Sequence, residues 1–227
     1  MGEGANTAVR DARLLPAALA ARVAPAPGDQ AAIVRNLTTF PPIVLVRGVF
    51  FEGLGRVVAG TRSAALWGDL VRAAGAPEQA IPFRQYPHAD FYRLYYLAAR
   101  VLYPGEPFPK ALRRTAREFF PIFRNSMLGK TMTAFMGSEP QTILPLLAKA
   151  YNLSVAGNHH VCELVGGPTG TKVSWRCAVE PVEWYEETFA GIVEGAAPPG
   201  RTLKVTPTAR SPRAADGLHD RAFEISW

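Results

Sequence analysis

The sequence predicts an α+β protein in which an N-terminal helical half packs on a small C-terminal antiparallel sheet. Within residues 61–150, apolar side chains recur at helical spacing, whereas residues 158–227 consist of short alternating segments separated by Gly- and Pro-rich breaks. This second part predicts the order strand, strand, helix, strand, strand. Of the 227 residues, 48% are hydrophobic, which is enough for one domain with a buried core.

The domain is expected to span residues 39–227, after an N-terminal extension. Residues 1–38 are rich in Ala, Pro and Gly and indicate a flexible segment. Residues 43–51 contain several β-branched side chains and predict a strand, which passes into a turn at Gly53 and Gly55.

Five helices are predicted between that strand and the sheet. They span residues 64–74, 90–102, 107–123, 126–136 and 139–150. The second is the clearest, because Phe91, Leu94 and Tyr95 begin an apolar stripe at i, i+3, i+4 spacing. The third has a basic face, which is more typical of a solvated surface than of a phosphate site. That face consists of Lys110, Arg113, Arg114 and Arg117.

The predicted sheet begins with a hairpin around a Gly- and Pro-rich break. Its strands are expected over residues 158–165 and 172–179. The alternation of apolar side chains favours a register that places Cys162 opposite Trp175 and, in the same alignment, His160 opposite Cys177. The helix and the two strands that follow are predicted over residues 183–196, 203–205 and 223–227.

Composition and charge narrow the class of protein. No apolar run approaches the ~18 residues that a membrane span needs, so no span is expected. Two cysteines imply no disulfide framework, and a cytoplasmic location is expected. The net charge of +6 allows nucleic acid or an anionic surface as a partner, but arginines scattered through an Ala-, Gly- and Pro-rich chain account for it without one.

Two groups of residues suggest specific chemistry. The run Gly129–Thr131 is similar to the end of a phosphate-binding loop, but Arg124 stands where that motif needs glycine, and the surroundings are helical. His160, Cys162 and Cys177 share a face in the predicted register, which is a minimal zinc set without a fourth ligand. The same residues could form a Cys–His nucleophile pair, whereas the simpler alternative is that both cysteines are core residues.

The predicted interior is rich in aromatic side chains from both halves of the chain. They include Tyr92, Tyr95, Tyr96, Phe119, Phe120, Phe123 and Trp175. Such side chains either fill a packed core or line a pocket for an apolar ligand between helices and sheet. The residues expected to line the pocket are Tyr95, Phe119, Phe123, His160, Trp175 and Cys177.

Short sequence motifs are distributed along the chain from Tyr86 to its last residue. They are Tyr86-Pro87, Asp90-Phe91, Leu102 to Gly105, Glu118-Phe119, Gly129-Lys130, Gly157-Asn158, Gly166 to Pro168, Gly191 to Gly195 and Phe223 to Trp227. Together they resemble a bacterial paralogous family of unknown function that is abundant in myxobacteria. The resemblance covers residues 43–227 and identifies a family without identifying a chemistry.

That family is in turn similar to the group of haem-nitric-oxide/oxygen-binding domains, four-vinyl-reductase ligand-binding domains and TRAPP trafficking subunits. The resemblance implies a helical half with a strand–strand–helix–strand–strand unit, and members that bind haem or small hydrophobic molecules or act as dimerising adaptors. The haem domains use a histidine on the helix before the sheet and a Tyr-x-Ser-x-Arg motif. Here residues 139–150 contain no histidine, and Lys172 replaces the tyrosine although Ser174 and Arg176 are present, so haem is not expected.

Three hypotheses about function follow. The first is a non-enzymatic regulatory or sensory domain that binds a small hydrophobic ligand between helices and sheet, and that self-associates or docks on another protein. The second is a ligand-free, dimerising protein–protein adaptor similar to the trafficking subunits. The third is a metal- or cysteine-dependent enzyme that uses His160, Cys162 and Cys177.

Overall fold

The structure, a computed structural model, describes most of the predicted domain. The described residues are 44–125, 130, 139–156, 159–163, 170–177, 182–198, 200–211 and 219–227. Within these ranges the side chains of Phe123, residues 159–163, Arg176, Cys177 and Val182 are not described. The expected extension over residues 1–38 and most of the helix expected over residues 126–136 lie outside the described residues.

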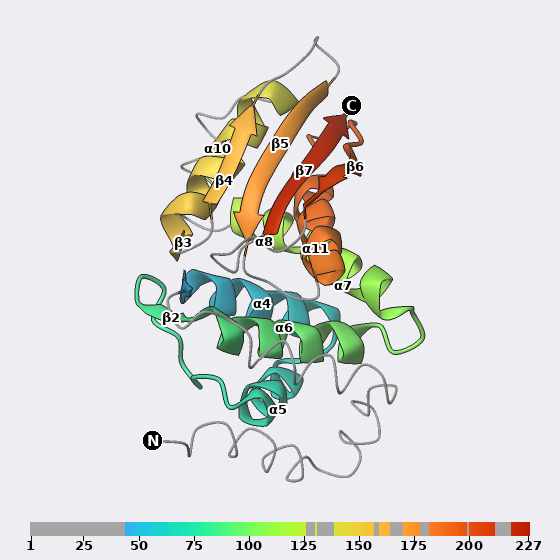
Figure 1. The fold of residues 1–227 in the computed structure, drawn as a ribbon. Helices are drawn as coiled ribbons and strands as arrows, with labels where there is room; N and C mark the ends of the chain where they lie inside the picture. The colour runs from blue at the N-terminus through green and yellow to red at the C-terminus, as the bar shows by residue number, and fades with distance from the viewer. Residues whose placement is uncertain are drawn as a thin grey trace.

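The architecture is a helical layer and a four-stranded antiparallel sheet, joined by helices that reach from one to the other (Figure 1). This confirms the predicted α+β fold class. The helical layer contains α4 (Val49–Thr61), α5 (Ala64–Ala74) and α6 (His88–Leu102). A small antiparallel sheet of order β2-β1-β3 lies beside it, formed by β1 (Leu45–Arg47), β2 (Gln85–Pro87) and β3 (Val155–Ala156).

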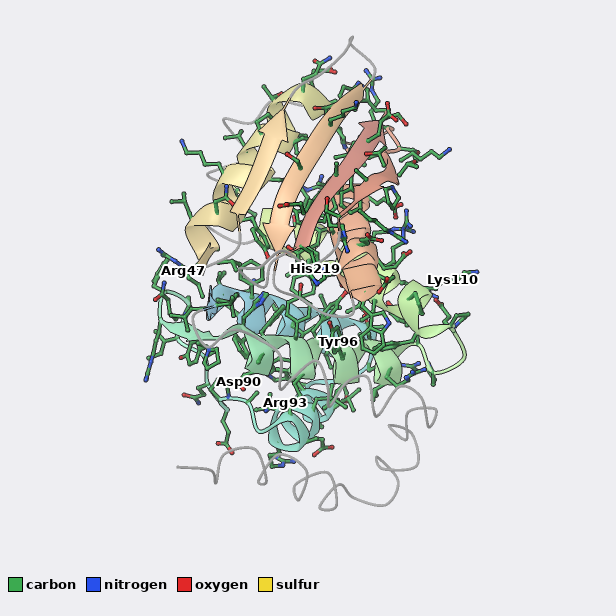
Figure 2. The ribbon with its side chains drawn as sticks, in the orientation of Figure 1. Arg47, Asp90, Arg93, Tyr96, Lys110 and His219 are labelled. Atoms are coloured by element: carbon green, nitrogen blue, oxygen red, sulfur yellow. The ribbon has the colours of Figure 1, made fainter. Side chains whose placement is uncertain are left out.

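Helix α5 begins and ends at the residues that the sequence predicts, because both of its ends carry local signals. The Ser63 hydroxyl accepts a hydrogen bond from the Leu66 amide at 3.3 Å, and Gly75 follows the last turn with a left-handed φ of 60°. Arg93 of α6 donates to the Ala74 carbonyl at 2.8 Å, beside the Asp90 carboxylate at 3.5 Å (Figure 2). This contact places a cation at the C-terminus of α5 and ties α5 to α6.

The prediction of a strand over residues 43–51 is wrong for the second half of that range. Only Leu45–Arg47 forms a strand, and α4 starts at Val49 and passes through Gly53 and Gly55, where a turn was expected. Phe51, Leu54 and Val58 of α4 are buried at helical spacing. A short apolar run does not distinguish strand from helix, and here the tertiary packing of the apolar face outweighs the poor helix propensity of glycine.

The helix predicted over residues 107–123 is two helices, α7 (Phe108–Arg117) and α8 (Phe119–Asn125). Pro121 explains the interruption, because a proline has no amide hydrogen to donate to the carbonyl of Arg117. Helix α10 (Pro140–Ser154) begins next to the predicted residue and extends one turn further.

The four-stranded sheet has the order β4-β5-β7-β6, with α11 inserted in sequence between the two halves. The bounds are His159–Glu163 for β4, Gly170–Cys177 for β5, Val182–Gly195 for α11, Lys204–Arg210 for β6 and His219–Ser226 for β7. Pro207 lies in β6, an edge strand whose register shifts between Pro207 and Ala209. The edge position tolerates a residue that cannot donate to a ladder.

The hairpin register differs by two residues from the prediction. In the structure His160 pairs with Trp175 and Cys162 pairs with Val173, so Cys162 is not opposite Trp175. A slip of two residues leaves every side chain on its own face, and alternation alone therefore cannot distinguish the two alignments. Gly170, expected in the break, is already part of β5 and pairs with Ser226.

Candidate functional site

Helix α11 links the two halves of the molecule, since one of its faces packs on α7 and another faces the sheet (Figure 1). It corresponds to the helix predicted over residues 183–196, and Tyr185, Phe189 and Val193 lie along it at helical spacing. The structure describes two contact surfaces of different chemistry on this helix.

The first surface is a close crossing with α7, made by two glycines one turn apart. A β-carbon at Gly191 would lie 2.2 Å from the Arg113 carbonyl oxygen and 2.7 Å from the Ala116 β-carbon. At Gly195 it would lie 2.1 Å from the Arg117 carbonyl oxygen. No side chain fits at either position, so both glycines are required for this helix–helix distance.

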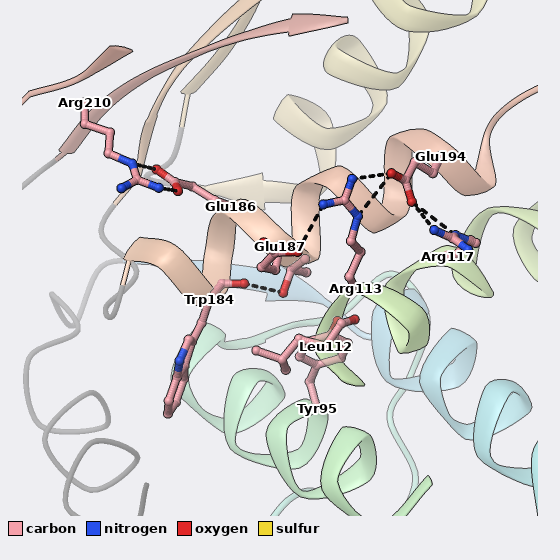
Figure 3. Close-up of polar contacts among 10 residues, drawn as sticks. Tyr95, Leu112, Arg113, Arg117, Trp184, Glu186, Glu187, Glu194 and Arg210 are labelled. Carbon is pink, nitrogen blue, oxygen red and sulfur yellow. Dashed lines mark hydrogen bonds and ion pairs between the residues drawn. The ribbon is translucent and has the colours of Figure 1, made fainter. Parts of the chain in front are cut away.

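Ion pairs flank the crossing (Figure 3). Arg113 donates through Nε to the Glu194 carboxylate at 3.1 Å and through Nη1 to Glu187 at 3.2 Å, and Arg117 Nε also donates to Glu194 at 3.2 Å. Burial by itself would raise the pKa of Glu194, but the hydrogen bonds from Arg113 and Arg117 outweigh it and hold that pKa below its ordinary value. Two members of the predicted basic face are thus structural partners of α11.

The second surface of α11 is aromatic and faces the sheet. Trp175 of β5 stacks on Phe223 of β7, with ring centroids 4.0 Å apart and an interplanar angle of 14°. Phe189 lies 3.8 Å and Tyr185 lies 5.6 Å from Trp175, measured between ring centroids. Trp175 is 2% exposed, so this group forms the apolar interior between α11 and the sheet.

A chain of aromatic contacts continues from Tyr185 into the helical layer. Tyr185 lies 6.2 Å from Tyr92, which lies 6.0 Å from Tyr95, and Tyr95 lies 6.0 Å from Phe119. The Tyr95 hydroxyl donates to the Leu112 carbonyl at 2.6 Å, and burial raises the pKa of Tyr95. Three predicted pocket residues, Tyr95, Phe119 and Trp175, are therefore connected through side chains that the sequence did not single out as a site.

The other predicted pocket and metal residues stay untested. The side chains of Phe123, His160, Cys162 and Cys177 lie outside the part of the chain that the structure describes. Among the residues that it does describe, no three His, Cys, Asp or Glu side chains could together hold a metal ion. Lys130 is helical, whereas a phosphate-binding loop would require a strand–loop–helix arrangement.

Four half-buried aromatic residues contact the rings that connect the sheet with the helical layer, and we call them the interlayer wall. The wall comprises Phe50, Phe119, Tyr151 and Phe189, from four different helices. Phe50 lies 6.4 Å from Tyr151 between ring centroids, and the Tyr185 hydroxyl donates to the Tyr151 hydroxyl at 2.7 Å. The wall thus combines apolar rings with one pair of hydroxyls, the composition typical of a small-molecule site.

A charge cluster around the buried side chains of Glu186 and Arg221 lies between α11 and the sheet. The Glu186 carboxylate accepts hydrogen bonds from Arg210 Nε at 2.9 Å and Nη2 at 2.5 Å (Figure 3), and forms an ion pair with Arg221 at 3.3 Å. Arg221 also donates to the Ser211 carbonyl at 2.8 Å. His219 lies at the end of the sheet that faces the helical layer (Figure 2). These contacts join α11 to β6 and β7 and satisfy charges removed from water.

The chain belongs to the family described as "Protein of unknown function (DUF2378)", whose sequence profile matches residues 42–227. This confirms the family resemblance. No curated protein matches the chain. No helix within the described residues is long and apolar enough to cross a membrane.

Solved structures with a similar fold are H-NOX domains, which confirms the distant similarity to haem-nitric-oxide-binding proteins. An oxygen-binding H-NOX domain related to soluble guanylate cyclases, solved as its oxygen complex, superposes with a TM-score of 0.60 at 12% identity and covers 79% of this chain and 94% of that chain. A mutant of the T. Tengcongensis H-NOX superposes with a TM-score of 0.59 at 12% identity, over 79% and 96%. At this identity the likeness shows the fold alone.

The described residues do not fit haem. Helix α10, which precedes the sheet, contains no histidine, and its Tyr151 hydroxyl is hydrogen-bonded to Tyr185. His88 lies in the helical layer against Tyr92, 4.6 Å between ring centroids, and burial lowers the pKa of His88 to about 3. We therefore derive no function through haem.

Proposed function

We propose that this chain is a non-enzymatic sensory or regulatory domain that binds a small apolar molecule at the interlayer wall. The observation that carries the proposal is the aromatic connection that runs from Trp175 in the sheet through Tyr185 and Tyr92 to Tyr95 in the helical layer. The residues of the interlayer wall, which contact this connection, are half-buried and come from four helices. A ligand among them would exclude water from rings that are now part-exposed, and this gain favours binding.

Helix α11 supplies a route from such a ligand to the rest of the molecule. Its aromatic face would contact the ligand, while Gly191 and Gly195 hold its other face at a fixed distance from α7. A ligand that displaced Phe189 or Tyr185 would therefore act on α7 through a closely packed contact. Such packed contacts transmit displacements because they have little room to deform.

The test combines native mass spectrometry of the freshly purified protein with titration of the neutral fluorescent probe N-phenyl-1-naphthylamine. We expect an added non-covalent mass, or saturable probe binding, and roughly tenfold weaker binding in Phe119→Ala. Phe83→Ala is the matched control, because Phe83 is 73% exposed and lies outside the wall. Equal binding in the two variants contradicts the proposal.

Trp175→Ala tests the sheet side of the same site. Removing the indole opens a cavity next to Phe223 and should abolish ligand retention. Circular dichroism establishes whether the variant is folded. A folded Trp175→Ala protein with unchanged ligand content contradicts the proposal from the sheet side.

The second candidate function, a ligand-free dimerising adaptor, is favoured by one specific observation. Ile81 and Phe83, in the loop before β2, are 56% and 73% exposed. Neighbouring exposed apolar side chains are typical of protein contact sites. Sedimentation of the wild type and of Phe83→Glu decides this alternative, since an adaptor that uses this loop loses its dimer in the variant.

A further inference from the structure

We infer that the groove between α4 and α5 is a second binding site, for a small organic cation of the alkylammonium class. The groove has a volume of about 340 Å³ and lies on the surface of the helical layer, apart from the interlayer wall. Cavities of this size are at the lower end of the range for small-molecule sites. The residues that decide its chemistry are Trp67, Gly55, Glu52, Arg56 and Glu78.

An indole ring forms part of the groove lining, and Gly55 of α4 packs directly against that ring. A β-carbon at Gly55 would lie 3.0 Å from Cε2 and 3.2 Å from Cζ2 of Trp67. Gly55 is inside α4, where glycine costs up to about 1 kcal/mol relative to alanine. The close approach to Trp67 gives a physical reason for tolerating that cost.

The charges that line the groove sum to −1 at neutral pH. Glu52 and Glu78 contribute two negative charges and Arg56 one positive charge. Arg56 forms an ion pair with Glu52 at 2.5 Å, whereas Glu78 forms no ion pair with another described residue. The charge left over on the lining is therefore the Glu78 carboxylate, in a groove that Trp67 also lines.

A groove lined by a carboxylate, an indole and apolar side chains matches one ligand chemistry best. The face of Trp is the strongest π-partner for an ammonium cation, and the Glu78 carboxylate attracts the same charge. Pro77 and Ala80 provide apolar surface for the methyl or methylene groups of the ligand. An anion would be repelled by this lining, and a neutral apolar ligand would gain nothing from Glu78.

The experiment is a 15N–1H NMR titration of the indole N–H signals with choline chloride, and in parallel with 3,3-dimethyl-1-butanol, its uncharged isostere. We expect choline to shift the Trp67 signal saturably and the isostere to leave it nearly unchanged. Glu78→Gln should weaken choline binding about threefold, whereas Glu224→Gln, which removes one exposed carboxylate far along the chain, should leave it unchanged.

Gly55→Ala is the second test, because a β-carbon at this position lies 3.0 Å from the Trp67 ring and forces the ring to shift within the groove. Choline binding should weaken, and circular dichroism establishes whether the variant is folded. Trp67→Leu should weaken binding about tenfold, read from the ligand signals. Equal affinity for choline and its isostere, no shift with choline, or no difference between Glu78→Gln and Glu224→Gln each overturns the inference.

Discussion

The two surfaces of α11 differ in how much the distance to the neighbouring element can change. Towards α7, Gly191 and Gly195 permit one distance only, and arginine–glutamate pairs flank the crossing. Towards the sheet, Tyr185 and Phe189 contact Trp175 through large rings, with half-buried neighbours around them. Rings of this kind can shift and repack with modest cost, whereas backbone in contact with backbone cannot. The glycine surface is therefore the fixed side of the helix, and the aromatic surface is the side where the proposed ligand would act.

The largest effect is expected from Gly191→Val. Two γ-methyl groups beyond a β-carbon that already lies 2.2 Å from a carbonyl oxygen would force α7 and α11 apart, so the free energy of unfolding should fall by more than ~3 kcal/mol. Urea unfolding followed by circular dichroism measures it. Gly60→Ala is the control, since nothing lies within 4 Å of a β-carbon there, and it should stabilise α4 slightly. Similar changes in the two variants would show that the crossing is not close.

Glu194→Gln tests the ion pairs at the same crossing. The carboxylate bridges Arg113 and Arg117, and losing its charge should lower the free energy of unfolding by about 2 kcal/mol. Glu106→Gln is the matched control, because its partner Arg114 is exposed and such pairs contribute at most ~1 kcal/mol. If both variants lose the same amount, the charges do not reinforce the fixed side of α11.

The pH dependence of the free energy of unfolding tests the packing on the aromatic surface of α11. His88 packs on Tyr92, which contacts Tyr185 of α11. Burial lowers the pKa of His88 from 6.5 to about 3, so the unfolded chain takes up a proton first as the pH falls. The stability that neutral His88 contributes is complete above pH 6.5 and is lost progressively towards pH 3. Between pH 7.5 and 5.5 the loss should be about 1.4 kcal/mol.

Glu194 does not contribute in this range, because its pKa lies below its ordinary value and the carboxylate stays ionised at pH 5.5. Urea midpoints at the two pH values measure the slope, and His88→Gln should reduce it. An unchanged slope in that variant would assign the titration to another histidine.

The smallest effect is expected from Tyr185→Phe. It removes the hydrogen bond to the Tyr151 hydroxyl and leaves the ring contact with Trp175, so the cost should be about 1 kcal/mol. Tyr151→Phe removes the same bond, so the double variant should cost less than the sum of the two single variants. Additive losses would mean that the bond between the two hydroxyls contributes nothing to stability.

Much of the fold could be predicted, because the local signals and the tertiary structure agree. Helix α5 has a capping serine and a terminal glycine, and α6 and α11 have apolar stripes at helical spacing. Where local signals were weak, the prediction failed. The glycines of α4 indicated a turn, but the burial of Phe51 and Leu54 stabilises a helix through them.

The candidate site could be predicted less well, because it depends on distances between segments far apart in the chain. Aromatic content indicated that Tyr95, Phe119 and Trp175 were interior, but their connection passes through Tyr185 and Tyr92. The segment from Gly191 to Gly195 was visible as a family motif, and its spacing of four residues is the one signal that could have indicated a close helix crossing.

By itself the sequence determined the class of fold, the order of strands and helix along the C-terminal part of the chain, and the inward faces of β5, β6 and β7. These depend on the period of apolar residues, which is a local property of the chain. Only the tertiary structure decided the two-residue shift in the hairpin register, the pairing of Arg113 and Arg117 with Glu194, and the approach of Gly55 to Trp67. Each of these depends on how closely two distant segments pack, and that distance is set by the whole core.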